Sequence, residues 1–489
     1  MCSWLCTAAA SNAQPILDSL RCGQAQLARA LAAHGGEARI GALTQLAFRA
    51  EGPVRNAYQG FAASRWRDPE ANGRQELEMA MDFAQGRYYQ LNVQRLSGGL
   101  DLAFATLALG PQVQTLRLAE KLAVRSSAPS AEAAAAQVND IPSRLLPPLL
   151  LRRARENLAS VRCVAAGLDF SWDARTRISL ELDEQHRVTQ AQVPQPDPMD
   201  GEAVVSWRFS GQQTVAGIVW PQRTQLLRRG VPLMDLEISD LKVNAALEAS
   251  RFVLPEGFVE RNDSPALQTV KVADGLWEVR GIGGGTYRVP VLEAPEYLVV
   301  FDAPLANAVS RQVMAQIRQH IGAKPVRYVV LSHFHGDHSG GLQAWAEAGA
   351  TLLVSPGDRA YVEQLLSVRS VLALPVTAAA AGPKPVLQTI DADQDLPLSS
   401  PPGTAPMRVQ RFLGSPHVAD MLVVYHGASG SLLQADLFSA LTPFNATYAH
   451  FAQWVASHPL APQRVVGVHH DPLSSSDLQR LARGASATR

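Results

Sequence analysis

The sequence has 489 residues, which is too long for one ordinary domain, so we expect about two or three. Lys plus Arg and Asp plus Glu each number 44, and the resulting formal net charge of zero argues against a basic nucleic-acid-binding surface. No apolar run reaches the roughly 20 residues that a transmembrane helix needs. No nucleic-acid partner and no transmembrane segment are therefore expected.

Residues 1–13 are apolar or small and end in an A-x-A-like pattern. This pattern is typical of the second half of a signal peptide, although the basic start is missing, and an unstructured N-terminus is the alternative. A periplasmic or secreted location is predicted, with a cytoplasmic one as the other option. If the protein is exported, Cys22 and Cys163 lie in an oxidising compartment, where they could form a disulfide.

Residues 14–265 are predicted to form a β-rich accessory domain with helices. The helices are expected at 14–34 and at 145–158, where Pro residues open the segment. Strands are expected at 43–50 and 86–96, a linker is expected at 126–136, and alternating apolar and polar residues between 177 and 255 predict an antiparallel meander.

Two stretches of this region carry a resemblance. Gly217-Ile218-Val219-Trp220-Pro221-Gln222-Arg223 and the segment 238–255 together resemble the β-sheet of periplasmic lipoprotein-carrier proteins. The resemblance implies a curved half-barrel that holds acyl chains. An unrelated β-rich accessory domain is the alternative.

From residue 266 the pattern changes to strands that alternate with helices. Strands are expected at 269–279 and 286–292, and the glycine run between them (281–285) is interpreted as a turn near the mouth of a site. A buried strand at 297–301 and a helix at 308–322 follow. This alternation predicts two mixed sheets, each covered by helices on its outer face.

The most informative stretch is 326–342, in which a short apolar strand is followed by His333, His335, Asp337 and His338. The two residues His333 and His335 lie two positions apart at a strand end and therefore project to the same side. Imidazole and carboxylate ligands suit Zn²⁺ and also, less often, Mn²⁺ or Fe²⁺. No Cys lies nearby, so an open hydrolytic metal site is a better interpretation than a closed structural one.

This segment resembles the metal-binding motif of the metallo-β-lactamase-fold hydrolases, and the resemblance covers roughly residues 266–489. It implies an α+β fold, namely an αββα sandwich, placed here after the β-rich N-terminal domain. It also implies two metal ions per chain, with Zn²⁺ expected. An acidic residue at the position of Asp302 is structural in this family, so no catalytic role is expected for it.

Later strand ends offer the remaining ligands in the order that the resemblance implies: His417, Asp436 and His469, with His470 as the competitor of His469. Carried over from the family, one metal is held by His333, His335 and His417, the other is held by Asp337, His338 and His469, and Asp436 bridges the two.

The predicted reaction is hydrolysis of an ester, thioester, lactone or related bond by a hydroxide that bridges the metals, with Asp337 as its orienting and proton-accepting group. The bridging Asp436 argues against a β-lactamase, which stays open as an alternative together with a phosphodiesterase. His335 stands where oxygen-reducing diiron members carry a carboxylate, which disfavours a redox role. A second class of function is an envelope lipid-binding or ligand-binding protein whose working part is the N-terminal β domain.

Overall fold

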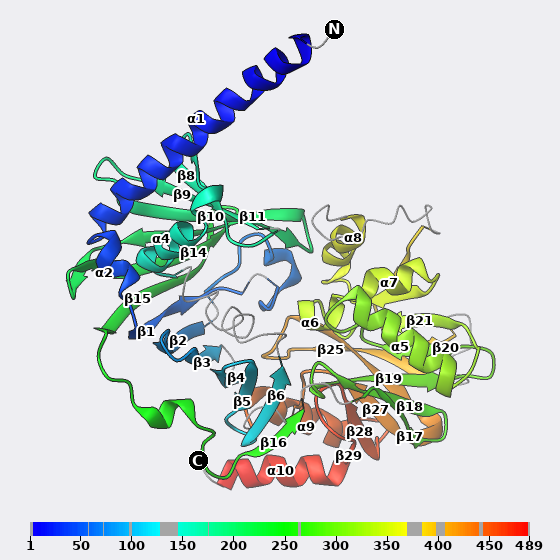
Figure 1. The fold of residues 1–489 in the computed structure, drawn as a ribbon. Helices are drawn as coiled ribbons and strands as arrows, with labels where there is room; N and C mark the ends of the chain where they lie inside the picture. The colour runs from blue at the N-terminus through cyan, green and yellow to red at the C-terminus, as the bar shows by residue number, and fades with distance from the viewer. Residues whose placement is uncertain are drawn as a thin grey trace.

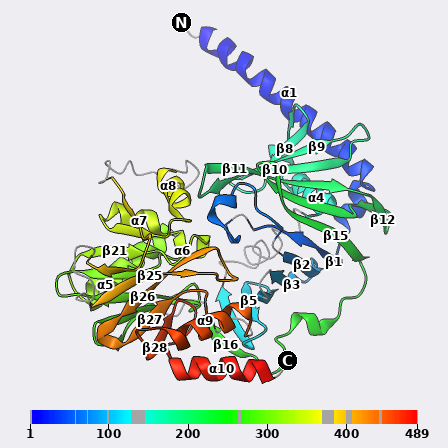
Figure 2. The ribbon, with the colours of Figure 1, turned by 180° about the vertical axis from the view of Figure 1, so that it is seen from behind.

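The structure is a computed structural model that describes residues 3–487, apart from residues 57, 72, 97–99, 128–144, 175, 263–265, 369–383, 398–405 and 440–443. Positions 128–136 of the predicted linker lie outside the described residues. Figures 1 and 2 show two bodies side by side, a large β-sheet with the long N-terminal helix and a sandwich of sheets and helices.

The N-terminal body is built on one 14-stranded sheet, in which sequence neighbours pair as antiparallel hairpins and only the last strand, β16, pairs parallel with its neighbour β6. The strand order is β16-β6-β5-β4-β3-β2-β1-β15-β14-β11-β10-β9-β8-β7. The strands are β1 (Gln45–Val54), β2 (Gly73–Asp82), β3 (Arg87–Leu96), β4 (Leu100–Leu109), β5 (Gln112–Arg117), β6 (Leu122–Ser127), β7 (Arg162–Val164), β8 (Gly167–Ser171), β9 (Arg177–Leu182), β10 (Val188–Asp197), β11 (Gly201–Ser210), β14 (Arg223–Arg228), β15 (Val231–Val243) and β16 (Val259–Asn262), and β12 (Gln213–Val215) pairs with β13 (Ile218–Trp220) separately.

Helices cover one face of this sheet. They are α1 (Ser3–Ala33), α2 (Glu37–Gly41) and α4 (Pro147–Glu156), with short 3-10 turns at Ala63–Arg65, Leu158–Ser160 and Ala249–Phe252. Leu27 and Leu31 of α1 pack with Leu150 of α4 in one buried cluster with strand residues such as Phe48 and Phe170. The expected helices and meander are confirmed, with α1 beginning already at Ser3. Side chains alternate between the two faces of a strand, and the face under α1 and α4 carries the largest apolar cluster of this body, while smaller clusters around Phe252 and Leu116 lie on the opposite face.

A disulfide joins Cys22 of α1 to Cys163 of β7, across 141 positions of sequence. It fixes the helix to the far end of the sheet. In Figure 1 the N-terminal part of α1 extends beyond the sheet. Within the described part of the chain, no helix combines the length and the apolar character that a bilayer crossing requires.

Replacing both Cys22 and Cys163 by serine is expected to lower the free energy of unfolding by about 2–4 kcal/mol, because the link restricts the unfolded chain. Denaturant unfolding of the oxidised wild type and of the variant measures this difference. Reduced wild type is the matched control and should unfold like the variant. Equal midpoints for oxidised wild type and variant would contradict the prediction.

The C-terminal body contains two sheets that are each built from consecutive strands. The first holds β17 (Gln268–Ala273), β18 (Leu276–Ile282), β19 (Tyr287–Glu293), β20 (Leu298–Phe301), β21 (Val326–Val330), β22 (Thr351–Val354) and β23 (Val386–Thr389). The second holds β24 (Gln394–Leu396), β25 (Met407–Leu413), β26 (Asp420–His426), β27 (Ser431–Gln434), β28 (Arg464–Gly467) and β29 (Leu473–Ser474). The helices are α5 (Asn307–His320), α6 (Gly336–Ser339), α7 (Leu342–Glu347), α8 (Arg359–Ser367), α9 (Ala446–Ser457) and α10 (Ser475–Ala487), with a 3-10 turn at Gly427–Ser429.

The two sheets pack face to face with helices outside. Val299 and Phe301 of β20 lie in a buried cluster with residues of the second sheet such as Val424, whereas Val300 lies in the cluster that includes Val313 of α5. Alternate residues of one strand thus pack either between the two sheets or under the outer helices, because successive side chains point to opposite faces. The fold is α+β with an αββα sandwich, as expected.

One strand prediction was wrong. The segment 269–279 is not one strand but the hairpin of β17 and β18, which turns at Asp274 and Gly275. Gly275 has a φ of 67°, a left-handed conformation that glycine adopts without strain. The Asp-Gly pair is a recognised hairpin signal that outweighs the continuous apolar pattern around it.

Candidate metal centre

The His-rich motif begins where strand β21 leaves the first sheet. His333 and His335 follow the strand, and His335 precedes the short helix α6, in which Asp337 and His338 lie. The backbone N–H groups of His338 and Ser339 both donate to the carbonyl of His335, each at 2.9 Å. This tight turn brings the four side chains to one side of the strand end.

The later candidates come from strand ends of the second sheet. His417 follows β25, Asp436 follows β27 and His469 follows β28. Ligand-type atoms of His333, His335, His417 and Asp436 all lie within 4.8 Å of one another, and so do those of Asp337, His338 and His469. The structure thus brings all seven predicted residues together in the two groups that the resemblance implied.

The distances within each group are those of ligands that share one cation. Nε2 of His333 lies 3.3 Å from Nε2 of His417, and Nε2 of His338 lies 3.4 Å from Nε2 of His469. Tetrahedral ligands about 2.0–2.1 Å from a zinc ion are about 3.3–3.4 Å apart. Nδ1 of His335 is buried and has no hydrogen-bond partner among the described residues, so its free lone pair also fits a metal.

Asp436 lies between the groups. Its Oδ2 is 3.1 Å from Nε2 of His417, and its Oδ1 is 3.2 Å from Nε2 of both His338 and His469. A single carboxylate therefore reaches nitrogen atoms of both groups, one through each oxygen. Such a position suits a carboxylate that bridges two cations.

His469 and His470, the two candidates for the last ligand, make different contacts. Nδ1 of His469 is 3.1 Å from the carbonyl oxygen of Thr286, to which it can donate, and its Nε2 faces His338. His470 instead pairs with Gln434, whose Nε2 donates to Nε2 of His470 at 2.7 Å. The side chain of His470 is thereby committed elsewhere, and only His469 joins the cluster.

Asp302 supports the cluster from behind. This buried carboxylate accepts hydrogen bonds from the backbone N–H of Ser332 at 2.7 Å and from its hydroxyl at 2.9 Å. Its Oδ2 also lies 2.9 Å from Nδ1 of His338. A carboxylate that accepts from the second ring nitrogen of a histidine orients the first nitrogen towards a metal. This matches the structural role expected for Asp302.

The histidines do not titrate alike. Burial lowers the pKa of His335 to about 3 and holds the pKa of His333 well below its usual value. Both rings are therefore neutral at neutral pH, which is the form that binds metals. Burial also opposes the charged form of His338, but the carboxylates of Asp436 and Asp337 raise its pKa well above the usual value. This side of the cluster is rich in negative charge that a divalent cation would balance.

Asp337 is held by residues that sequence reasoning missed. The hydroxyl of Tyr287 donates to its Oδ2 at 3.0 Å, and Nε2 of Gln59 donates to its Oδ1. Burial and the nearby carboxylates raise the pKa of Tyr287, so the phenol keeps its proton. Burial opposes ionisation of Asp337, yet its pKa is lowered by neighbouring histidines such as His338. Tyr287 lies two positions after the glycine run, and this run was the signal that could have pointed to it.

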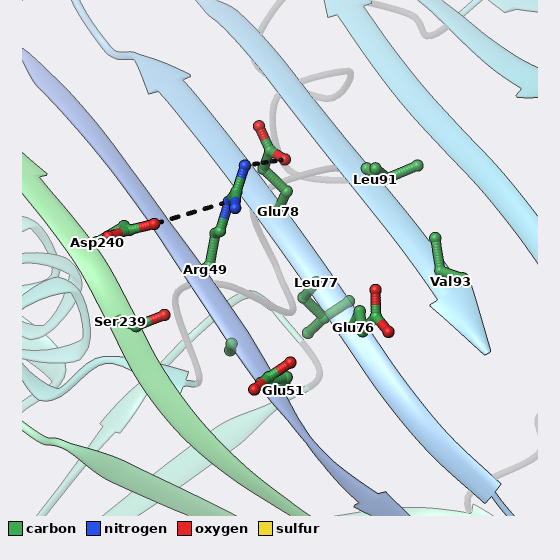
Figure 3. A pocket seen from close by; sticks show the side chains of 10 residues that line it. Arg49, Glu51, Glu76, Leu77, Glu78, Leu91, Val93, Ser239 and Asp240 are labelled. Atoms are coloured by element: carbon green, nitrogen blue, oxygen red, sulfur yellow. Dashed lines mark ion pairs between the residues drawn. The ribbon is translucent and has the colours of Figure 1, made fainter. Parts of the chain in front are cut away.

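A separate hollow of about 360 Å³ lies on the N-terminal sheet, on the face opposite α1 and α4. Figure 3 shows Arg49 between Glu78 and Asp240, with ion-pair distances of 3.5 and 3.8 Å. Glu51 and Glu76 also line this hollow. Exposed ion pairs of this kind contribute little to stability, and the cluster is distinct from the His-rich centre.

The C-terminal body is thus an αββα sandwich that carries two groups of residues able to hold a metal ion. Residues 291–364, in the C-terminal body, match the model of the metallo-beta-lactamase superfamily. A curated relative, the linear primary-alkylsulfatase of Pseudomonas sp. (strain ATCC 19151), is 40% identical over 55 residues. That match covers 11% of this chain and only 10% of the relative, so the chain spans about a tenth of the relative's length.

The solved structures with some likeness in fold include metallo-beta-lactamases. The enzyme from Hirschia baltica is 18% identical, with a TM-score of 0.32, and the match covers 45% of this chain and 97% of that one. The enzyme from Pontibacter korlensis is 18% identical, with a TM-score of 0.34, and the match covers 45% and 99%. At these scores the likeness carries no inference about this chain. The predicted resemblance of the N-terminal region to lipoprotein carriers has no support from the comparisons.

Proposed function

We propose that the protein is a dinuclear metallohydrolase that binds two zinc ions and cleaves an ester-type bond of a small molecule. The observation that carries the proposal is the pairing of two ligand groups around Asp436, which reaches nitrogen atoms of both at 3.1–3.2 Å. The first cation would be held by His333, His335 and His417, and the second by Asp337, His338 and His469. Mn²⁺ and Fe²⁺ suit the same ligands less well.

Bound divalent cations supply Lewis-acid chemistry, since they lower the pKa of water and polarise a carbonyl, phosphoryl or sulfuryl oxygen. The protein's own contribution is orientation. Asp337 is ionised and fixed by donors on both of its oxygens, so it can hold the attacking water and accept its proton. Tyr287 keeps its proton and donates to Asp337 throughout.

The first candidates for the substrate are carboxylic esters, thioesters and lactones. The second candidate is a sulfate ester. The alkylsulfatase relative favours this second candidate through its 40% identity over 55 residues. Attack by water on either kind of ester releases an alcohol and an acid, so one centre is suited to both. Preference between them depends on the residues around the centre.

The test is metal analysis by emission spectrometry on full-length protein purified without chelator, followed by a screen of chromogenic acetate, thioester, lactone and sulfate substrates. We expect close to two zinc ions per chain and hydrolysis of at least one substrate class that a chelator abolishes and added zinc restores. Metal-free protein that takes up no zinc on titration would overturn the proposal. It would instead favour a ligand-binding role for the N-terminal body.

We also propose that the protein works in the periplasm or outside the cell. The signal-like residues 1–13 and the disulfide between Cys22 and Cys163 support this location, because structural disulfides persist mainly in oxidising compartments. Fractionation of cells that produce the full chain tests it. Recovery of the protein in the cytoplasm with free thiols would contradict it.

A further inference from the structure

A short segment of the N-terminal body, residues 58–61, lies against the metal centre. It belongs to the connection between β1 and β2 of the large sheet and touches the sandwich through its backbone and one side chain. The contacts are Gly336 N–H to Tyr58 carbonyl at 3.0 Å, Gln59 Nε2 to Asp337 Oδ1, His335 Nε2 to Gly60 carbonyl at 2.9 Å, and Ala419 N–H to Phe61 carbonyl at 2.9 Å. Two of these four contacts end on candidate metal ligands.

The carbonyl of Gly60 decides which nitrogen of His335 is free. A carbonyl oxygen can only accept, so Nε2 of His335 carries the hydrogen and donates it at 2.9 Å. Nδ1 of His335 is buried without a hydrogen-bond partner among the described residues, so no neighbour there accepts a hydrogen from it and the atom offers its lone pair. Gly60 thus fixes the tautomer in which Nδ1 can bind a cation.

The side chain of Gln59 contacts the second ligand group, which consists of Asp337, His338 and His469. Its Nε2 donates to Oδ1 of Asp337, while Tyr287 donates to Oδ2 at 3.0 Å. With a donor on each oxygen, the carboxylate of Asp337 cannot rotate freely. One donor comes from the N-terminal body and the other from the sandwich, so both bodies define the orientation of one candidate ligand.

The segment is held in place by a buried anchor. The hydroxyl of Tyr58 donates to Oδ2 of Asp197 at 2.9 Å, and that carboxylate also pairs with Arg228 at 3.0 Å. Asp197 accepts further hydrogen bonds from the backbone of Met199 and Asp200. Burial and Asp197 raise the pKa of Tyr58 to about 12, so the hydroxyl keeps the proton that it donates. An anchored segment can orient its neighbours, whereas a loose loop cannot.

We propose that residues 58–61 of the N-terminal body are a built-in part of the metal centre, in which Gln59 positions Asp337 and the Gly60 carbonyl orients His335. The proposal rests on the proposed function, since it assigns these residues to the same centre. It gives the N-terminal body a role in hydrolysis itself. Gln59 is a positioning residue, because it acts through Asp337.

The test compares Gln59→Ala with Gln85→Ala in full-length protein. Gln85 is an exposed glutamine in the turn between β2 and β3 of the same sheet, so its variant controls for loss of a surface carboxamide. Each chain is stripped with chelator and titrated calorimetrically with zinc. Gln59→Ala is expected to bind one of its two zinc ions about 10–100-fold more weakly, as for other residues that orient ligands. Its kcat should fall while its KM and unfolding midpoint stay near those of Gln85→Ala.

Tyr58→Phe provides a second, milder variant that removes only the anchoring hydroxyl. It should shift zinc affinity in the same direction by a smaller factor. If Gln59→Ala and Tyr58→Phe both bind zinc like wild type and retain its kcat, the inference is wrong while the proposed function stands. A wild-type chain that takes up no zinc overturns the proposed function, and this inference with it.

Discussion

Replacing Asp436 by alanine is expected to reduce bound zinc from two ions per chain to one or none, and to lower turnover by more than the roughly 100-fold loss typical of a group that only orients a ligand. The reason is its position, with one oxygen 3.1 Å from His417 and the other 3.2 Å from both His338 and His469. Without this negative charge, two cations would repel each other at close range. Metal analysis and steady-state kinetics measure both effects.

Two further variants test whether the charge of Asp436 causes the expected loss of zinc. Asp436→Asn keeps the shape and removes the charge, so it should lose nearly as much metal if charge is the cause. Asp274→Ala removes an exposed carboxylate from the β17–β18 turn, which pairs only with Lys271 among the contacts described, and should behave like wild type. Full zinc content and full activity in Asp436→Ala would show that this carboxylate does not bridge.

Asp302→Asn is expected to weaken zinc binding by about 10–100-fold, although Asp302 itself is not a proposed ligand. Its carboxylate lies 2.9 Å from Nδ1 of His338 and accepts from Ser332. The φ of Asp302 is 67°, a left-handed conformation that Asn also tolerates, so this substitution tests the charge with little added backbone strain. Competition with a chromogenic zinc chelator measures the affinity.

Ser332→Ala is the matched control for Asp302→Asn. It removes the hydroxyl that donates to Asp302 at 2.9 Å and that also lies 2.9 Å from Nδ1 of His333, and it leaves the contact between Asp302 and His338 in place. We expect a much smaller effect on zinc affinity, with some loss of stability, since one buried hydrogen bond contributes about 1 kcal/mol. Equal losses of zinc affinity in the two variants would contradict a special role for the charge of Asp302 beside His338, since among the described residues the Ser332 hydroxyl contacts only the neighbouring candidate ligand His333 and Asp302.

The two bodies of the molecule meet at the centre in more than one place. Besides residues 58–61, Arg117 of β5 and Arg261 of β16 both donate to the carbonyl of Gly284, in the turn that precedes Tyr287. The N-terminal sheet therefore supports both the motif after β21 and the turn that carries Tyr287. Among the described residues, the N-terminal sheet thus contributes supporting contacts to the centre, while the grouped His and Asp side chains come from the sandwich.

The sequence by itself was enough to predict the motif and its surroundings. His333, His335, Asp337 and His338 are close in sequence, and their geometry follows from a strand end and one helical turn, so local rules suffice. His417 and Asp436 were also predictable, because the family resemblance supplied their order. The two covered sheets of the sandwich were predictable from the alternation of strands and helices. The β17–β18 hairpin was missed because the apolar pattern resumes directly after the Asp-Gly turn.

The tertiary structure alone decided which residues complete the centre. His469 and His470 are adjacent and chemically identical, and the hydrogen bonds of His470 with Gln434 and with the carbonyl of Asp471 direct it away. Gln59 lies 278 positions from Asp337, and Gly60 lies 275 positions from His335. A backbone carbonyl carries no side-chain signature, and a glutamine in a loop resembles any other. Their roles depend on how the N-terminal sheet and the sandwich pack together, which no local pattern encodes.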